Sequence, residues 1–428
     1  MIADEWIRES MPPDWRIARV KDHARVINGY PFDSKLFATD AGHPLVRIRD
    51  ILNSETVVHY DGDWIPEAAI TAGDILVGMD GDFNVARWKG GDALLNQRVC
   101  CIRTVNSIDP GYLYYALPEP LKLINEFTYS TTVKHLSSFD VLDIRLPCPP
   151  IEQQKLIANY LDRETDRIDE LIAEKQRMLA LLEEKHTALI SRVVTRGLDP
   201  NAPLTPSGQE WLGDIPAHWR LERLKFQLLG LEQGWSPQCD NYPAEPDDWG
   251  VLKVGAVNAW SFNPLENKRL PDEVEPLLEY EIKQYDVLMS RANTTQLLGS
   301  VVYVDEISSK LLLCDKLYRL SSNDDQLDRE FLVAFLRASP GRFQLEREAS
   351  GTSGSMQNIG QDTVKNTWIA IPPLDEQKKI SGYISNFRRQ TERMYVALRR
   401  TVDLLTERRA ALITAAVTGR IPLEEMTG

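Results

Sequence analysis

Residues 149–197 read PPIEQQKLIANYLDRETDRIDELIAEKQRMLALLEEKHTALISRVVTRG, and residues 372–420 repeat this stretch without a gap as PPLDEQKKISGYISNFRRQTERMYVALRRTVDLLTERRAALITAAVTGR. Of the 49 aligned positions, 15 are identical. Apolar residues recur in both copies at steps of three and four, which is the pattern of a coiled-coil seam. Each copy begins with Pro-Pro and the first ends at Gly197, as helix ends prefer. The stretch therefore predicts two long helices, over 151–196 and 374–420.

These two helices are expected to pack against each other. A helix of about 45 residues is roughly 65 Å long and would leave its apolar stripe in water if it stood alone. Because a whole domain separates the two copies, the second helix must return along the first. The pair is therefore expected to be antiparallel, with an approximate two-fold axis. A helical hairpin inside one ordinary domain is the alternative, and the long separation disfavours it.

A second repeat places a domain before each helix. The stretch MPPDWRIARVK at 11–21 returns as IPAHWRLERLK at 215–225, with an offset of 204, whereas the helical stretch returns at 223. The predicted order is a first domain at 1–150, a helix at 151–196, a linker at 197–214, a second domain at 215–373 and a helix at 374–420. Trp15 and Trp219 belong to this repeat and are expected to pack each domain against its neighbouring helix.

Composition limits the possible classes of protein. The net charge of −14 is unlike that of a simple nucleic-acid binder, so we expect weak DNA binding by this chain alone and help from a basic partner. No apolar run resembles a membrane span or a secretory signal. The cysteines are odd in number and irregularly spaced, which predicts reduced thiols in the cytoplasm. They are Cys100, Cys101, Cys148, Cys239 and Cys314.

Each domain alternates short β-like runs with turns and a little helix, so the expected fold class is α+β. The predicted strands are Leu45–Ile51, Asp74–Val77, Val99–Thr104, Val251–Val257, Asp286–Met289, Ser300–Val304 and Lys316–Leu320. The predicted short helices are Tyr112–Leu117 and Phe331–Ala338.

Polar loops occur at matching places in the two domains, after a β-like run and again before each Pro-Pro. Arg, Asn, Gln and Thr side chains read base edges, whereas Lys and Arg also contact phosphates. For any single residue, simple solvation of the loop is at least as good an explanation. The candidate DNA-binding residues of the first domain are Tyr30, Lys35, Arg47, Arg49, Asp80, Asp82, Phe83, Arg87, Trp88, Lys89, Asn96, Gln97, Arg98, Thr131, Thr132, Lys134 and His135. Those of the second domain are Trp235, Ser236, Lys253, Asn258, Trp260, Arg291, Asn293, Thr294, Thr295, Gln296, Lys316, Ser353, Ser355, Gln357 and Asn358.

Four aromatic residues near turns have two interpretations. Tyr30, Phe32, Trp235 and Trp260 could stack on unstacked bases. Aromatic residues more often fill cores, so packing is the favoured interpretation for each of them.

The sequence lacks the common catalytic motifs. It contains no phosphate-binding Gly-x-x-x-x-Gly-Lys loop, no His-Glu-x-x-His and no paired Cys-x-x-Cys. The tetrapeptides of DNA amino-methyltransferases are absent as well. Glu183-Glu184-Lys185 has a nuclease-like spacing but lies in the middle of a predicted helix, where such pairs are routine. No catalytic, metal-binding or cofactor-binding residue is predicted.

At this point the motifs resemble a known family. Gly73-Asp74-Ile75-Leu76 followed by Gly81-Asp82-Phe83, the run at 94–99, and the run at 132–136 leading to Pro149-Pro150 are similar to type I restriction-modification specificity subunits. The runs at 286–291 and 371–377 resemble the second half of the same family. Copy two lacks the Gly-Asp-Phe turn and has Cys314-Asp315-Lys316 where copy one has Asn96-Gln97-Arg98.

The resemblance implies two target-recognition domains that read different halves of a split DNA sequence, with the two helices as a coiled-coil spacer. It also implies two methyltransferase subunits docked on the spacer and restriction-translocase subunits added for cleavage. S-adenosylmethionine and ATP would then bind to those partners and not to this chain. The alternatives are a lone nuclease or methyltransferase with a cryptic active site, and a coiled-coil scaffold that binds only protein.

Overall fold

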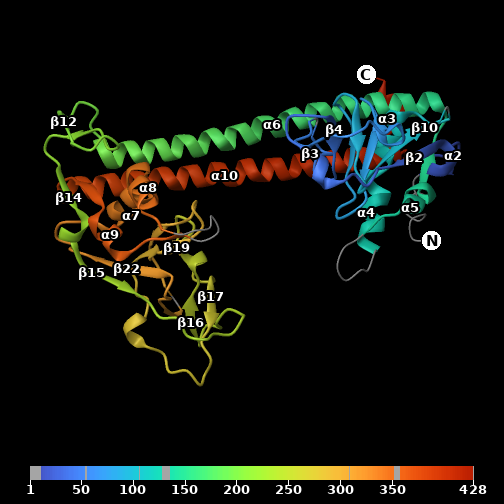
Figure 1. Cartoon of the computed structure of the whole chain (residues 1–428). Helices are drawn as coiled ribbons and strands as arrows, with labels where there is room; N and C mark the ends of the chain where they lie inside the picture. Colours follow the sequence, from blue (N-terminus) through green and yellow to red (C-terminus); the bar gives the residue numbers. More distant parts are fainter. Residues whose placement is uncertain are drawn as a thin grey trace. The chain divides into compact units, whose positions relative to one another are not determined.

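The computed structural model of the chain describes residues 11–53, 55–105, 107–127, 135–307, 309–350 and 357–427. The chain divides into two compact units (Figure 1). Unit 1 comprises residues 1–176 and 399–428, and unit 2 comprises residues 177–398. Both division points fall inside long helices, so each helix contributes one part to each unit.

The two long helices are α6 (Ile151–Arg196) and α10 (Leu374–Val417). In unit 1, the start of α6 and the end of α10 share one core, which contains Ile157, Leu161 and Ala416. In unit 2, the end of α6 and the start of α10 share another core, which contains Ile190 and Ile384. The two helices therefore run antiparallel within each unit, as the sequence predicts.

Unit 1 is built from short strands and helices around the first part of α6 and the last part of α10. Its strands are β1 (Arg16–Arg19), β2 (Ala24–Asn28), β3 (Phe37–Ala38), β4 (His43–Val46), β5 (His59–Tyr60), β6 (Ala69–Ile70), β7 (Ile75–Gly78), β8 (Val85–Arg87), β9 (Ala93–Leu95), β10 (Val99–Thr104) and β11 (Arg145–Cys148). Its other helices are α2 (Val20–His23), α3 (Pro110–Ala116), α4 (Pro118–Phe127) and α5 (Ser138–Asp143), with the 3-10 turns η2 (Ser34–Leu36), η3 (Pro66–Ala68) and η7 (Leu423–Met426).

Unit 2 has the same kinds of element. Its strands are β12 (Leu204–Pro206), β13 (Asp214–Pro216), β14 (Arg220–Arg223), β15 (Leu228–Gln233), β16 (Trp249–Leu252), β17 (Asn267–Arg269), β18 (Val287–Ser290), β19 (Ala292–Asn293), β20 (Val301–Tyr303), β21 (Lys310–Leu312), β22 (Leu317–Ser322), β23 (Gln357–Asn358) and β24 (Trp368–Ile371). Its helices are α7 (Arg329–Arg337), α8 (Ser339–Arg347) and α9 (Gln361–Asn366), with the 3-10 turns η4 (Leu224–Phe226), η5 (Val254–Val257) and η6 (Leu278–Tyr280).

The sheets of the two units have matching topology. The four-stranded sheet has the order β2-β10-β7-β8 in unit 1 and β15-β22-β18-β20 in unit 2, and all of its pairs are antiparallel. Each unit also contains a parallel pair of strands, β4 with β9 in unit 1 and β16 with β21 in unit 2. The strand before each long helix pairs with the strand that carries the 11–21 or 215–225 repeat, β11 with β1 and β24 with β14. The duplication of the sequence is therefore a duplication of the fold.

Two predicted strands are too long. The run Leu45–Ile51 is a strand only to Val46, because Asp50 closes a turn by accepting from the backbone N–H of Arg47 at 3.1 Å. The run Val251–Val257 is a strand only to Leu252, and the 3-10 turn η5 follows from Val254. In both places apolar residues beyond the end of the strand are buried under a turn. A run of apolar residues alone therefore does not show where the strand ends.

Trp15 and Trp219, which belong to the repeat at 11–21 and 215–225, pack where the sequence predicts. Trp15 is buried in the unit 1 core with Val417 of α10, and its Nε1 donates to Oε1 of Gln153 on α6 at 2.9 Å. Trp219 is buried in the unit 2 core with Val193 of α6. Each therefore fastens its domain to the long helices.

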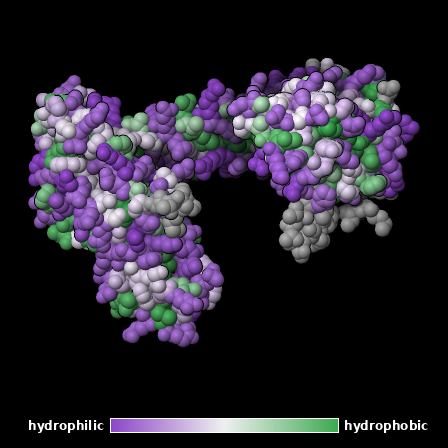
Figure 2. Space-filling view, in the orientation of Figure 1, coloured by the Kyte–Doolittle hydropathy of each residue, from purple (hydrophilic) through white to green (hydrophobic). Residues whose placement is uncertain are grey.

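The cysteines and the surface hydropathy of the described residues give no sign of disulfides or of a large hydrophobic patch on the face shown. All five cysteines are free thiols, and burial raises the pKa of Cys100 and of Cys314 to about 12. The face shown in Figure 2 is mostly hydrophilic, with small scattered hydrophobic groups. Among the described residues, no helix is long and apolar enough to cross a membrane.

Candidate nucleic-acid interface

Four segments of unit 1 that are far apart in the sequence meet through backbone hydrogen bonds. The N–H of Tyr30 donates to the carbonyl of Leu95 at 2.8 Å, and the N–H of Met79 donates to the carbonyl of Arg98 at 3.0 Å. The N–H of Leu136 then donates to the carbonyl of Met79 at 2.7 Å. We call these four joined segments the unit 1 platform: residues 29–30, 79–80, 96–98 and 135–136.

Unit 2 has the same platform, made of residues 234–235, 291–293, 314–316 and 357–359. The N–H of Trp235 donates to the carbonyl of Leu313 at 3.0 Å, and the N–H of Arg291 donates to the carbonyl of Lys316 at 2.9 Å. The N–H of Ile359 donates to the carbonyl of Arg291 at 2.8 Å. One backbone arrangement therefore presents different side chains in the two units.

A glycine in each platform allows one segment to approach another, and our sequence reasoning missed both. A Cβ at Gly29 would lie 1.9 Å from the carbonyl oxygen of Asn96, and a Cβ at Gly234 would lie 2.2 Å from the carbonyl oxygen of Leu313. Only glycine fits so close to a backbone. The signal in the sequence is a glycine followed by an aromatic residue in both copies, before Tyr30 and before Trp235.

Asp80 organises the charged side chains of the unit 1 platform. Its side chain is only 15% exposed and lies 3.3 Å from Nη1 of Arg98 and 2.8 Å from Nδ1 of His135. Arg98 and His135 are both 64% exposed. Asp80 therefore orients two exposed groups, and Arg98 is suited to donate to a phosphate or to a guanine edge.

The unit 2 platform presents Arg291 at the place that Met79 occupies in unit 1. The guanidinium of Arg291 lies 5.9 Å from the ring centroid of Tyr318 and donates to the carbonyl of Asp315 at 3.3 Å. Beyond it, Thr294, Thr295 and Gln296 are exposed. This is a row of donors and acceptors of the types that read base edges.

Comparison with known proteins identifies the family of this chain. The family model described as type I restriction modification DNA specificity domain matches residues 12–180 and 254–395. The EcoBI specificity subunit of Escherichia coli is 40% identical over 393 residues, which cover 89% of this chain and 78% of the relative. The MjaVIII specificity subunit of Methanocaldococcus jannaschii is 22% identical over 427 residues, which cover 92% of each chain.

This chain belongs to the family of type I restriction-modification specificity subunits.

A solved structure supports the same fold. A chain from a study titled for complex assembly and conformational transition of the type I R-M system has a TM-score of 0.67, with 19% sequence identity. The match covers 96% of this chain and 99% of the other. Because the chain belongs to the specificity-subunit family, it is a non-catalytic component that works with DNA and with other subunits of its system. Among the described residues, no group of His, Cys, Asp or Glu is placed to hold a metal ion.

Several predicted DNA-binding residues of the specificity subunit have structural roles instead. Phe83 and Trp88 are each only 2% exposed, and Trp88 Nε1 donates to the carbonyl of Gly91 at 2.8 Å. Asn293 is buried and donates to Oδ1 of Asn258 at 2.9 Å. Phe83, Trp88 and Asn293 lie in or beside the predicted polar loops, but their burial keeps them from touching DNA in this conformation.

Two arginines of the first domain are also committed to internal contacts. The Arg47 side chain is only 19% exposed and its Nε donates to Asp50 at 3.0 Å. Arg87 lies 3.4 Å from Asp162 on α6, and its guanidinium is 4.9 Å from the ring centroid of Tyr114 on α3. Arg87 therefore ties the sheet to the long helix.

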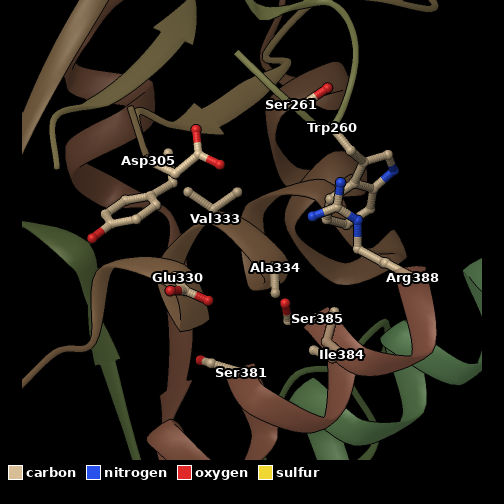
Figure 3. Close-up of a pocket in the computed structure, with 11 residues that line it drawn as sticks. Trp260, Ser261, Asp305, Glu330, Val333, Ala334, Ser381, Ile384, Ser385 and Arg388 are labelled. Carbon is tan, nitrogen blue, oxygen red and sulfur yellow. The ribbon is translucent and has the colours of Figure 1, made fainter. Parts of the chain in front are cut away.

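Trp260 is half-buried and packs against side chains of the surrounding helices. Its ring lies 4.7 Å from the guanidinium carbon of Arg388 on α10 and 4.9 Å from that of Arg337 on α7. His186 on α6 meets the ring edge-on, with the centroids 5.7 Å apart. Figure 3 shows Arg388 beside Trp260 at the edge of a hollow of about 190 Å³. Phe32 is buried and packs on Tyr60.

The remaining predicted residues fall into two groups. Those with exposed or half-buried side chains are Tyr30, Lys35, Arg49, Asp82, Lys89, Asn96, Gln97, Arg98, His135, Trp235, Ser236, Lys253, Asn258, Arg291, Thr294, Thr295, Gln296, Lys316, Gln357 and Asn358. Thr131, Thr132, Lys134, Ser353 and Ser355 lie outside the described residues.

Proposed function

We propose that each platform of this specificity subunit reads one half of a bipartite DNA target. The observation that carries the proposal is the pair of platforms, which share one backbone hydrogen-bond pattern but carry different side chains. Tyr30 and Trp235 stand at matching places, as do Met79 and Arg291. Two readers of one architecture with different side chains are what two different half-sites require.

The long helices supply the spacing in this proposal. Domains at 1–150 and 215–373 are readers, with 197–214 as linker, and the helices at 151–196 and 374–420 form a coiled-coil spacer with an approximate two-fold axis. The helix α6 is continuous from Ile151 to Arg196, which corresponds to about 70 Å at 1.5 Å per residue. A spacer of that length suits half-sites about one to two DNA turns apart.

The partners follow from the same proposal. Two methyltransferase subunits dock on the spacer, and restriction-translocase subunits join for cleavage, all in the cytoplasm where the DNA lies. S-adenosylmethionine and ATP bind to those partners. The chain's net charge of −14 supports this division, because basic partners then supply much of the attraction to phosphate.

The test of the two-reader proposal uses one variant in each platform. Arg98→Ala is expected to weaken recognition of one half-site and Arg291→Ala that of the other, each by about 1–3 kcal/mol. Binding of the complex with its methyltransferase would be measured on duplexes in which one half-site at a time is scrambled. If both variants weakened the same half-site, or each weakened both equally, the proposal would be wrong.

Docking of the partner is tested on the helix α10. Arg399 and Arg400 are both exposed, so reversing both charges to Glu leaves the core intact. Loss of co-purification with the methyltransferase subunit is expected, since like charges at a subunit interface are costly. Unchanged co-purification would place the docking surface elsewhere.

A further inference from the structure

Two arginines of unit 2 donate hydrogen bonds to backbone carbonyl oxygens in two of its loops. Arg337 is the last residue of α7, and Arg342 lies in α8. The loops are η5 with the residues that follow it, which include Asn258, and the stretch from Asn293 to Leu298. A cavity of about 360 Å³ lies between these loops and α6, and both arginines line it.

Arg337 holds the first loop. Its Nη2 donates to the carbonyl oxygens of Val257 at 2.8 Å and of Ala259. Its Nε donates to the carbonyl oxygen of Val301 on β20. The loop is thereby tied both to α7 and to the central sheet. Asn293 Nδ2 donates to Oδ1 of Asn258, so the first loop is also joined to the second.

Arg342 holds the second loop. Its Nη2 donates to the carbonyl oxygens of Gln296 at 3.0 Å and of Thr295 at 3.3 Å, and its Nη1 donates to that of Leu298. Glu346, one turn further along α8, accepts from the same guanidinium. The loop backbone is bound on its inner side, while the side chains of Thr295 and Gln296 stay exposed.

The long helices anchor both arginines. The backbone N–H of Ser339, at the start of α8, donates to Oγ of Ser191 on α6 at 3.1 Å. Arg337 and Arg388 of α10 both lie against the ring of Trp260. The loops of unit 2 are therefore connected to α6 and α10 through two short chains of contacts.

We propose that Arg337 and Arg342 are positioning residues that hold these two loops of unit 2 in the shape that recognises its half-site. They touch no base; they act by fixing the backbone from which Asn258, Thr295 and Gln296 project. This inference rests on the proposed reading function and adds to it the residues that determine the geometry of one reader.

Arginine is suited to this role in a way that lysine is not. Its planar guanidinium offers five donors in a rigid fork, so one side chain can fix several carbonyl oxygens in a defined geometry. Lysine would keep the charge but would fix fewer carbonyls with less directional control. A lysine variant should therefore keep part of the base discrimination that a glutamine variant loses, but not all of it.

The experiment measures base preference separately in the two half-sites. The full-length chain is co-purified with the methyltransferase subunit of the same system, and binding is measured on duplexes that carry each single-base change of the target. Gln296→Ala identifies the half-site that the second loop reads. Arg342→Gln, Arg342→Lys and Arg337→Lys are then compared with it, and Arg347→Ala is the control because Arg347 is exposed on the same helix.

In the half-site marked by Gln296→Ala, Arg342→Gln should reduce discrimination between the correct and a wrong base by about tenfold or more, since a mismatch ordinarily costs about 1–3 kcal/mol. The other half-site should keep its preference. Arg342→Lys and Arg337→Lys should give intermediate losses, and Arg347→Ala none. These lysine variants carry the test if the Arg342→Gln complex does not assemble.

Two results would overturn the inference: an unchanged base preference in the arginine variants, or an equal loss at both half-sites with a lower melting temperature. The second result would assign the arginines a general role in stability. Failure of the reading function itself is distinct, because the wild-type complex would then show no base preference in either half-site.

Discussion

The side chain of Gln154 accepts a hydrogen bond from the backbone N–H of Asp109 at 2.8 Å, and its Nε2 donates to the carbonyl of Pro149 at 2.8 Å. Unit 2 repeats this contact, because Gln377 accepts from the N–H of Asp328 at 2.8 Å. Each aspartate in turn caps the short helix that follows it, α3 or α7. A buried glutamine therefore fastens the start of each long helix to the domain that precedes it.

Replacing Gln154 should destabilise unit 1 selectively. Gln154→Ala leaves the half-buried N–H of Asp109 and the buried carbonyl of Pro149 without this partner, which should lower the free energy of unfolding by about 2–4 kcal/mol. Gln377→Ala should do the same in unit 2. Urea unfolding checks both, with Glu152→Ala as the control because its side chain is 80% exposed. A glutamine variant as stable as that control would show that the contact has little energetic weight.

The platform glycines should be intolerant of alanine. Gly29→Ala and Gly234→Ala each drive a methyl group into a backbone carbonyl, so the segment that carries Tyr30 or Trp235 must move. Each variant should lose recognition of its own half-site, with a stability cost of about 1–3 kcal/mol. Half-site binding measures the first effect and thermal unfolding the second.

Gly91 provides the matched control in unit 1. A Cβ there meets no atom within 4 Å, so Gly91→Ala should bind like the wild type. Wild-type half-site recognition by Gly29→Ala would contradict the platform as we describe it.

His186 should make unit 2 less stable in mild acid. Burial lowers the pKa of His186 below its usual 6.5, and the nearby Arg388 lowers it further, while Glu183 and Glu392 oppose this. Below about pH 6.5 the unfolded chain thus binds more protons at this residue than the folded chain does, and stability falls as pH falls. Above that pH the effect vanishes.

The His186→Gln variant isolates this contribution. The loss of melting temperature between about pH 7.5 and about pH 5.5 should be smaller in the variant than in the wild type, because glutamine does not titrate. Equal losses in the two proteins would mean that His186 keeps an ordinary pKa in the folded state.

Most of the order of domains and helices could be predicted because the sequence contains an internal duplication. The seam that predicts two helices repeats at an offset of 223, and the helices α6 and α10 occupy those stretches. The ends of strands could not be predicted as well, because the turn that Asp50 closes after β4 leaves no mark in the apolar pattern. The sequence also could not separate the exposed Thr295 from the buried Asn293, because both are small polar residues in one polar run and no local pattern marks Asn293 as the end of β19.

The candidate site was predicted by region and not by residue. Trp260 is among the candidate DNA-binding residues although packing is its favoured interpretation, and its ring lies against arginines from α7 and α10, which are far from it in the sequence. Sequence reasoning missed Gly29 and Gly234. Each glycine is needed because a distant backbone segment lies against it, and the only local sign of this is that a glycine stands before an aromatic residue in both copies. Contacts between distant segments decide both cases, and only the folded chain displays them.

The central claim is that this chain directs modification through two separate readers held at a set spacing. Mapping every methylated base produced when the chain is expressed with its methyltransferase subunit tests it most directly. We predict one motif with two defined blocks and a spacer of constant length and no base preference between them. A single uninterrupted motif, or two blocks whose separation varies from site to site, would contradict the account.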